Sequence, residues 1–109
     1  PGLGEYISGV ILYDETIRQA KKDGTSFGKV ITDAGIIPGI KVDTGAKDLA
    51  NHPQEKVTEG LDGLRSRIAE YYEMGARFAK WRAVITISKK IPSRGCIEAN
   101  AHALARYAA

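Results

Sequence analysis

Residues 78–87, which read FAKWRAVITI, constrain the fold more than any other stretch of this 109-residue sequence. β-Branched and aromatic residues dominate the run, Gly75 precedes it and residues 89–92 close it, so it predicts a β-strand. Alternate side chains of a strand share a face, which places Lys80 and Arg82 on the same side. A strand this apolar is typical of a sheet buried on both faces, where two cations need an anionic partner.

A second apolar run at residues 37–45 also carries charge, because Lys41 and Asp43 share one of its faces. If the two runs form neighbouring parallel strands, three cations and one carboxylate converge on one pocket. Two other interpretations stay open at this point. In the first, Lys41 and Asp43 form a structural ion pair. In the second, the cations of residues 78–87 pair with local carboxylates or lie in water at a strand end.

The rest of the chain alternates predicted strands and helices. A strand is expected at residues 6–13, a polar turn at 14–16, helical segments at 17–22, 26–35, 60–74 and 96–107, and a loop at 46–56. Three consecutive βα units favour a parallel sheet in an α/β fold, either an open doubly wound sheet or part of a (β/α)8 barrel. Because three strands alone leave two unpaired edges, we expect residues 1–109 to be a partial TIM-barrel domain, a fragment of a longer chain.

Composition narrows the classes of function. The net charge of +3 is spread among acidic residues, which is a weak signal for nucleic-acid binding. The single cysteine, Cys96, excludes an internal disulfide and suits a reducing cytosol, and no apolar run reaches the length of a transmembrane helix. No metal-ligand spacing involves His52, and no glycine-rich phosphate fingerprint follows a strand. We therefore expect a cytoplasmic protein without a metal, nucleic-acid or membrane partner.

Five segments of the sequence match motifs of a known enzyme family, in the same order and with the same spacing. They lie at residues 7–12, 39–43, 59–64, 75–82 and 104–108. Gly-Ile-Lys-Val-Asp in the second segment and Phe-Ala-Lys-Trp-Arg in the fourth are together highly specific. On these residues the sequence resembles class I fructose-bisphosphate aldolase. The resemblance implies a (β/α)8 barrel of which this chain supplies the second, third and fourth strands.

The resemblance also implies an activity. Enzymes of this family are lyases of glycolysis and gluconeogenesis, usually homotetramers. They cleave fructose 1,6-bisphosphate reversibly to dihydroxyacetone phosphate and glyceraldehyde 3-phosphate through a Schiff base, without a metal or other cofactor. By resemblance, Lys41 binds substrate and Asp43 helps to hold that lysine in place. Lys80 is the active-site lysine that positions substrate and supports carbon–carbon cleavage, and Arg82 binds substrate hydroxyl and phosphate groups.

Part of that family's machinery lies outside this sequence. The resemblance places the Schiff-base lysine on the sixth strand and the acids for proton transfer on the first and fifth. We therefore expect the fragment alone to be inactive, with neither Lys41 nor Lys80 as the Schiff-base former. Thr44 stands where many relatives carry a lysine, residues 46–57 form a divergent loop, and Trp81 is expected to pack between strand and helix. The alternative hypothesis is a non-catalytic domain that binds phosphorylated ligands, and a nucleic-acid module ranks below both.

Overall fold

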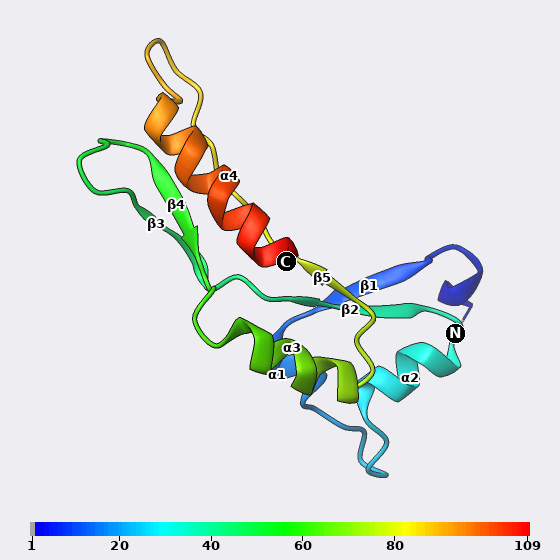
Figure 1. The fold of residues 1–109 in the computed structure, drawn as a ribbon. Helices are drawn as coiled ribbons and strands as arrows, with labels where there is room; N and C mark the ends of the chain where they lie inside the picture. Colours follow the sequence, from blue (N-terminus) through cyan, green and yellow to red (C-terminus); the bar gives the residue numbers. More distant parts are fainter. Residues whose placement is uncertain (1) are drawn as a thin grey trace. The chain divides into compact units, whose positions relative to one another are not determined.

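The computed structural model describes residues 2–109. Its elements, in chain order, are the 3-10 helix η1 (Leu3–Glu5), β1 (Gly9–Leu12), α1 (Asp14–Ile17), α2 (Phe27–Asp33), β2 (Ile37–Lys41), β3 (Gly45–Asp48), β4 (Lys56–Glu59), α3 (Leu64–Glu73), β5 (Phe78–Lys80) and α4 (Arg94–Ala108) (Figure 1). The chain divides into two compact units, one of Pro1–Val42 with Arg65–Lys80 and the other of Asp43–Leu64 with Trp81–Ala109. None of the helices in residues 2–109 is long and apolar enough to cross a membrane.

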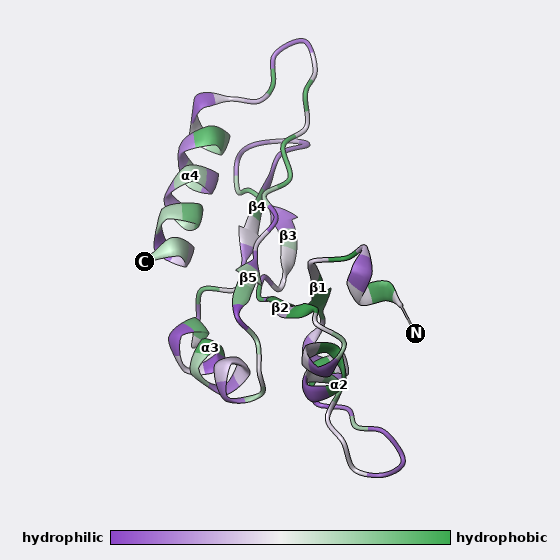
Figure 2. Cartoon of the chain, turned by 90° about the vertical axis from the view of Figure 1, so that its right-hand side faces the viewer, coloured by the Kyte–Doolittle hydropathy of each residue, from purple (hydrophilic) through white to green (hydrophobic). Residues whose placement is uncertain are grey.

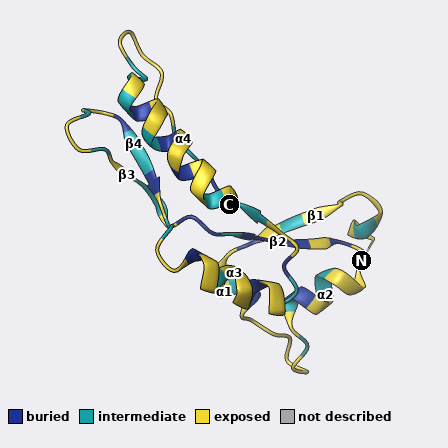
Figure 3. Cartoon of the chain, viewed as in Figure 1, coloured by how far each residue is buried: buried dark blue, intermediate teal, exposed yellow. Residues whose placement is uncertain are grey.

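The first unit is built on a three-stranded parallel sheet in the order β1-β2-β5. The register pairs Leu12 with Ile40 and Ile40 with Ala79, so these three side chains share a face. Helices α1, α2 and α3 lie along one side of the sheet (Figure 1), and Figure 2 shows α2 and α3 on that side. Leu12 and Ile40 are buried, and Figure 3 shows buried segments in β2. The prediction of parallel strands connected through helices is therefore confirmed, and the fold class is α/β.

The opposite face of this sheet is apolar and only partly covered within residues 2–109. Ile11 is 48% exposed and Phe78 is 40% exposed, and both stand beside Gly39 in the register. The ring of Phe78 fills the space above Gly39, because a methyl group at that position would collide with it. Glycine at this point of β2 therefore lets the aromatic ring pack close against the backbone of the sheet.

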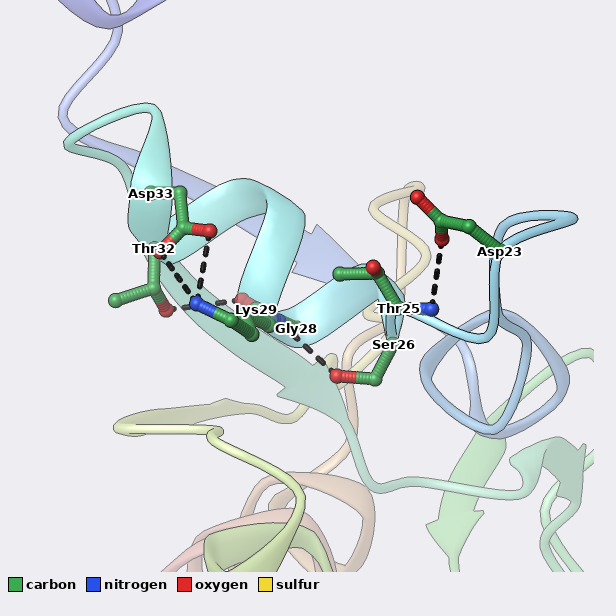
Figure 4. Close-up of polar contacts among 7 residues, drawn as sticks. All are labelled: Asp23, Thr25, Ser26, Gly28, Lys29, Thr32 and Asp33. Atoms are coloured by element: carbon green, nitrogen blue, oxygen red, sulfur yellow. Dashed lines mark hydrogen bonds and ion pairs between the residues drawn. The ribbon is translucent and has the colours of Figure 1, made fainter.

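Helix α2 confirms the prediction of a helix at residues 26–35, with slightly narrower bounds. The Ser26 side chain caps it by accepting a hydrogen bond from the Lys29 amide at 3.2 Å (Figure 4). Lys29 pairs with Asp33 one turn later at 3.0 Å, and Gly35 follows in a left-handed conformation with φ of 79°. Local side-chain and backbone preferences thus set both ends of this helix.

The second unit contains an antiparallel hairpin of β3 and β4, with helix α4 packed on β4. The prediction of a loop at residues 46–56 is wrong at both ends of that segment. The short strands lack the apolar alternation that marks a strand, and one of their cross-strand pairs is charged: Asp48 lies opposite Lys56 and accepts a hydrogen bond from its ammonium at 2.7 Å. A search for apolar periodicity therefore does not detect this hairpin.

Asn100 of α4 is buried and forms side-chain hydrogen bonds with the backbone of β4. Its side-chain amide donates to the Lys56 carbonyl at 2.9 Å, and its side-chain carbonyl accepts from the Thr58 amide at 3.4 Å. At the start of the helix, the Ser93 hydroxyl accepts a hydrogen bond from the Cys96 amide at 3.2 Å. Burial is the main cause of a raised pKa of the Cys96 thiol, so this thiol is protonated at neutral pH.

The strand predicted at residues 78–87 is wrong beyond Lys80, where β5 ends. Beyond that point, two side chains form hydrogen bonds with the backbone amide and carbonyl of Arg82, in place of a neighbouring strand. The Arg82 amide donates to the Asp43 carboxylate at 3.3 Å, and the Arg82 carbonyl accepts from the Thr58 hydroxyl at 2.7 Å. Strand alternation therefore does not extend from Lys80 to Arg82.

Several other boundaries differ from the sequence-based expectations. The prediction of a helical segment at residues 17–22 is wrong, because helix α1 begins at Asp14, within the predicted turn, and ends at Ile17. Acidic residues in the first turn of a helix are favourable, and α1 carries two of them, Asp14 and Glu15. Strands predicted at 6–13 and 37–45 are shortened to β1 and β2, and helices predicted at 60–74 and 96–107 are α3 and α4.

Trp81 is buried and stacks on Tyr107 of α4 with 5.4 Å between ring centroids, which confirms its predicted packing role.

Candidate functional site

Two lysines end two neighbouring parallel strands of the first unit. Lys41 is the last residue of β2, Lys80 is the last residue of β5, and the register places them directly opposite each other. The Val42 amide donates to the Lys80 carbonyl at 3.1 Å and continues this pairing past the strand ends. Both lysines are half-buried. The prediction that these two strands are parallel neighbours is therefore confirmed. Of the four charged residues expected to converge on one pocket, the register places Lys41 and Lys80 opposite each other.

The two lysine side chains leave the sheet on the face away from the helices. In the register, Lys41 and Lys80 follow Gly39 and Phe78 by two residues, so they share the face of Ile11 and Phe78 rather than that of buried Ile40. They also stand at the carboxyl ends of the strands, the edge at which parallel α/β sheets place their ligands. This geometry gives one sheet edge two lysines on neighbouring strands.

Tyr13 lies beside Lys41, and Arg67 contacts the residue that follows Lys41; the sequence interpretation did not include either of them. The ring centroid of Tyr13, which directly follows β1, lies 5.9 Å from the Lys41 ammonium. Arg67 of α3 donates from its guanidinium to the Val42 carbonyl at 3.0 Å. Strand alternation after Ile11 would have placed Tyr13 on the lysine face, but nothing in the sequence pattern singles out Arg67.

The pair suits a ligand that carries oxyanions. Among residues 2–109, no hydrogen bond or ion pair involves the ammonium of Lys80. Two cations on one edge attract a doubly charged phosphate group more strongly than either does alone, and each ammonium offers three donors. Within the described part of the chain, no group of three or more His, Cys, Asp or Glu side chains is placed to hold a metal ion.

Asp43 and Arg82 belong to the second unit and meet through the backbone. The buried Asp43 carboxylate accepts one hydrogen bond from the Gly45 amide at 3.1 Å and another from the Arg82 amide at 3.3 Å. The Arg82 side chain is exposed, and its guanidinium pairs with no side chain of residues 2–109. Asp43 thus fixes the chain at Arg82, whereas the predicted placement of both on strands is wrong because β2 and β5 end before them.

Comparisons with known proteins agree on one family. The family profile described as "Glycolytic: Fructose-bisphosphate aldolase class-I" matches residues 1–109. A protein of Xanthomonas campestris pv. campestris named "Probable fructose-bisphosphate aldolase class 1" is 71% identical over 100% of this chain. Two similar proteins of Arabidopsis thaliana are named "Fructose-bisphosphate aldolase 3, chloroplastic", at 54% identity, and "Fructose-bisphosphate aldolase 6, cytosolic", at 53% identity.

A solved structure gives the same result for the fold. Fructose-bisphosphate aldolase from Plasmodium falciparum, in a complex with TRAP and a small-molecule inhibitor, matches with a TM-score of 0.93 and 48% identity over 98% of this chain. The chain covers 31% of that structure's chain and 33% of the Xanthomonas protein, and 28% and 30% of the two Arabidopsis proteins. It therefore spans about a third of the length of the proteins it matches.

Proposed function

The chain belongs to the class I fructose-bisphosphate aldolase family, and from this premise we propose that it is part of an enzyme that cleaves fructose 1,6-bisphosphate reversibly to dihydroxyacetone phosphate and glyceraldehyde 3-phosphate. The observation that carries the proposal is the pairing of Lys41 with Lys80 at the carboxyl edge of a parallel sheet. Such a lysine pair provides positive charge for the phosphate-bearing substrate, and it stands where barrel enzymes place their catalytic side chains.

The proposal includes the architecture of the whole enzyme. We infer that residues 1–109 are a partial (β/α)8 barrel domain in which β1, β2 and β5 are the second, third and fourth barrel strands. The half-exposed face of Ile11 and Phe78 is then the barrel interior, which the remaining strands cover, and α1, α2 and α3 lie outside. This arrangement directs Lys41 and Lys80 into the mouth of the barrel.

Each site residue has a distinct proposed role. Lys41 and Arg82 bind substrate, with Lys41 acting as a point charge and Arg82 as a forked donor for phosphate or hydroxyl oxygens. Lys80 is the catalytic lysine that positions the substrate and stabilises charge during carbon–carbon cleavage. Asp43 supports the site by holding the backbone at Arg82 and, as proposed, by keeping Lys41 in place.

The Schiff-base lysine and the acids for proton transfer are proposed to lie in the part of the enzyme outside residues 1–109. The complete enzyme is proposed to act without a metal or other cofactor, as a homotetramer, in the glycolytic and gluconeogenic pathways of the cytoplasm. The naming of one relative as cytosolic supports that location, whereas another relative is named chloroplastic.

The complete protein and residues 1–109 alone are the two samples that test this function. The complete protein is expected to release glyceraldehyde 3-phosphate from fructose 1,6-bisphosphate in the presence of EDTA, measured by a coupled NADH assay, whereas residues 1–109 alone are expected to release none. Cleavage by residues 1–109 that Lys80→Ala abolishes would overturn the assignment of the missing groups. A complete protein that binds the sugar bisphosphate without cleaving it would favour the alternative, a non-catalytic domain for phosphorylated ligands.

A further inference from the structure

Val42 connects the two lysines of the site to helix α3. Its amide, which belongs to the peptide group that follows Lys41, donates to the Lys80 carbonyl at 3.1 Å. Its carbonyl accepts a hydrogen bond from the Arg67 guanidinium at 3.0 Å. The Val42 side chain is fully buried, with 0% exposure. The residue after Lys41 is therefore held on both sides of its backbone, by β5 and by α3.

Arg67 donates from a helix that is itself anchored. Tyr71, one turn after Arg67 on α3, is buried and donates its hydroxyl to the Asp14 carboxylate at 2.8 Å. Arg18, which directly follows α1, forms ion pairs with both Asp14 and Glu70. Each guanidinium-to-carboxylate distance is 3.0 Å. The hydrogen bond from Tyr71, followed by that from Arg18, lowers the pKa of Asp14, so its carboxylate is ionised at neutral pH.

The charge of Arg67 also lowers the pKa of Asp14, although less than those hydrogen bonds do. The Arg67 side chain is half-buried, and its guanidinium is planar and rigid. It therefore fixes the Val42 carbonyl relative to α3 more strictly than a flexible lysine ammonium would.

We propose that Arg67 is a positioning residue of the substrate site, acting on the Lys41 ammonium through the Val42 peptide. The inference rests on the proposed function, because it assigns Arg67 a part in the same site. Without the guanidinium, the Val42 carbonyl loses its helix-side donor, and the chain after Lys41 gains freedom to rotate. A shift of about 1 Å at a substrate-binding group is enough to reduce turnover by roughly 10²-fold.

A double-mutant cycle in the complete enzyme separates positioning from a purely structural role. Arg67→Met keeps the apolar stem and removes the donors, and it is expected to lower kcat/KM for fructose 1,6-bisphosphate about tenfold. In a Lys41→Met background the same change is expected to lower kcat/KM by less than about twofold, because the group that Arg67 positions is already absent. Arg67→Lys, which retains a donor but not the rigid planar guanidinium, is expected to lower kcat/KM by less than Arg67→Met does.

Arg65→Met is the matched control, since Arg65 is an exposed residue of the same helix. It is expected to leave kcat/KM unchanged. Equal losses from Arg67→Met in the wild-type and Lys41→Met backgrounds would show that Arg67 merely supports the fold, and would overturn the inference. If Lys41→Met itself keeps wild-type kcat/KM, or if the complete protein lacks aldolase activity, the proposed function fails first and the inference falls with it.

Discussion

Lys80→Met in the complete enzyme is expected to lower kcat/KM for fructose 1,6-bisphosphate by about 10²- to 10³-fold, the usual effect of removing one donor that stabilises charge in a transition state. Methionine preserves the apolar stem of the side chain and removes its ammonium. Lys80 is half-buried at the end of β5, and no group in residues 2–109 pairs with its ammonium. Its charge is therefore available to a ligand, and its loss is expected to reduce kcat itself.

Two companion variants make the Lys80 result interpretable. Lys41→Met is expected to raise KM more than it lowers kcat, because its proposed role is to bind substrate rather than to support bond cleavage. Lys22→Met is the control, since Lys22 is an exposed residue of the segment between α1 and α2 and is expected to leave both constants unchanged. Wild-type turnover and substrate affinity in both Lys80→Met and Lys41→Met would show that the lysine pair is not the substrate site.

Asn100→Ala is expected to destabilise the complete protein by about 2 kcal/mol, because the Thr58 amide loses its acceptor and the Lys56 carbonyl keeps only the weak donor of the Cys96 thiol at 3.6 Å. The side chain of Asn100 is 3% exposed and bonds the Lys56 carbonyl and the Thr58 amide at once. Alanine can replace neither bond, and the deletion also leaves a small cavity between α4 and the hairpin. The urea midpoint of unfolding measures the loss.

Amide hydrogen exchange at Thr58 gives this second prediction a local measurement. The Thr58 amide is expected to exchange faster in Asn100→Ala, since its acceptor is the Asn100 side chain. His102→Ala is the matched control on the same helix, because His102 is exposed and its replacement is expected to change stability by less than about 0.5 kcal/mol. An unchanged urea midpoint together with unchanged Thr58 exchange in Asn100→Ala would refute the anchoring role.

The sequence predicts the parallel sheet and its lysines because both depend on regular patterns. Apolar runs bounded by glycine and proline mark β2 and β5, and the βα order makes them parallel neighbours. Once the strands are neighbours, Lys41 and Lys80 must meet at their shared carboxyl edge. The same reasoning fails for Arg82, because side-chain hydrogen bonds from Thr58 and to Asp43 replace the strand after Lys80.

Features that depend on tertiary contacts are not predictable in this way. The hairpin of β3 and β4 carries a polar cross-strand pair, Asp48 with Lys56, so no apolar alternation reveals it. Arg67 looks like one of several dispersed charges in the sequence, and only the folded chain brings its guanidinium to the Val42 carbonyl. Resemblance to a family supplied the roles of Lys41, Asp43, Lys80 and Arg82, which remain proposals.

Mapping the substrate adduct tests most directly the claim that this part of the enzyme binds and positions substrate without forming the Schiff base. The complete protein is treated with dihydroxyacetone phosphate and sodium borohydride, digested, and analysed by peptide mass spectrometry. We expect one reduced adduct, on a lysine outside residues 1–109, with Lys41 and Lys80 unmodified. A reduced adduct on Lys41 or Lys80 would contradict the account, because that lysine would then be the covalent catalyst itself.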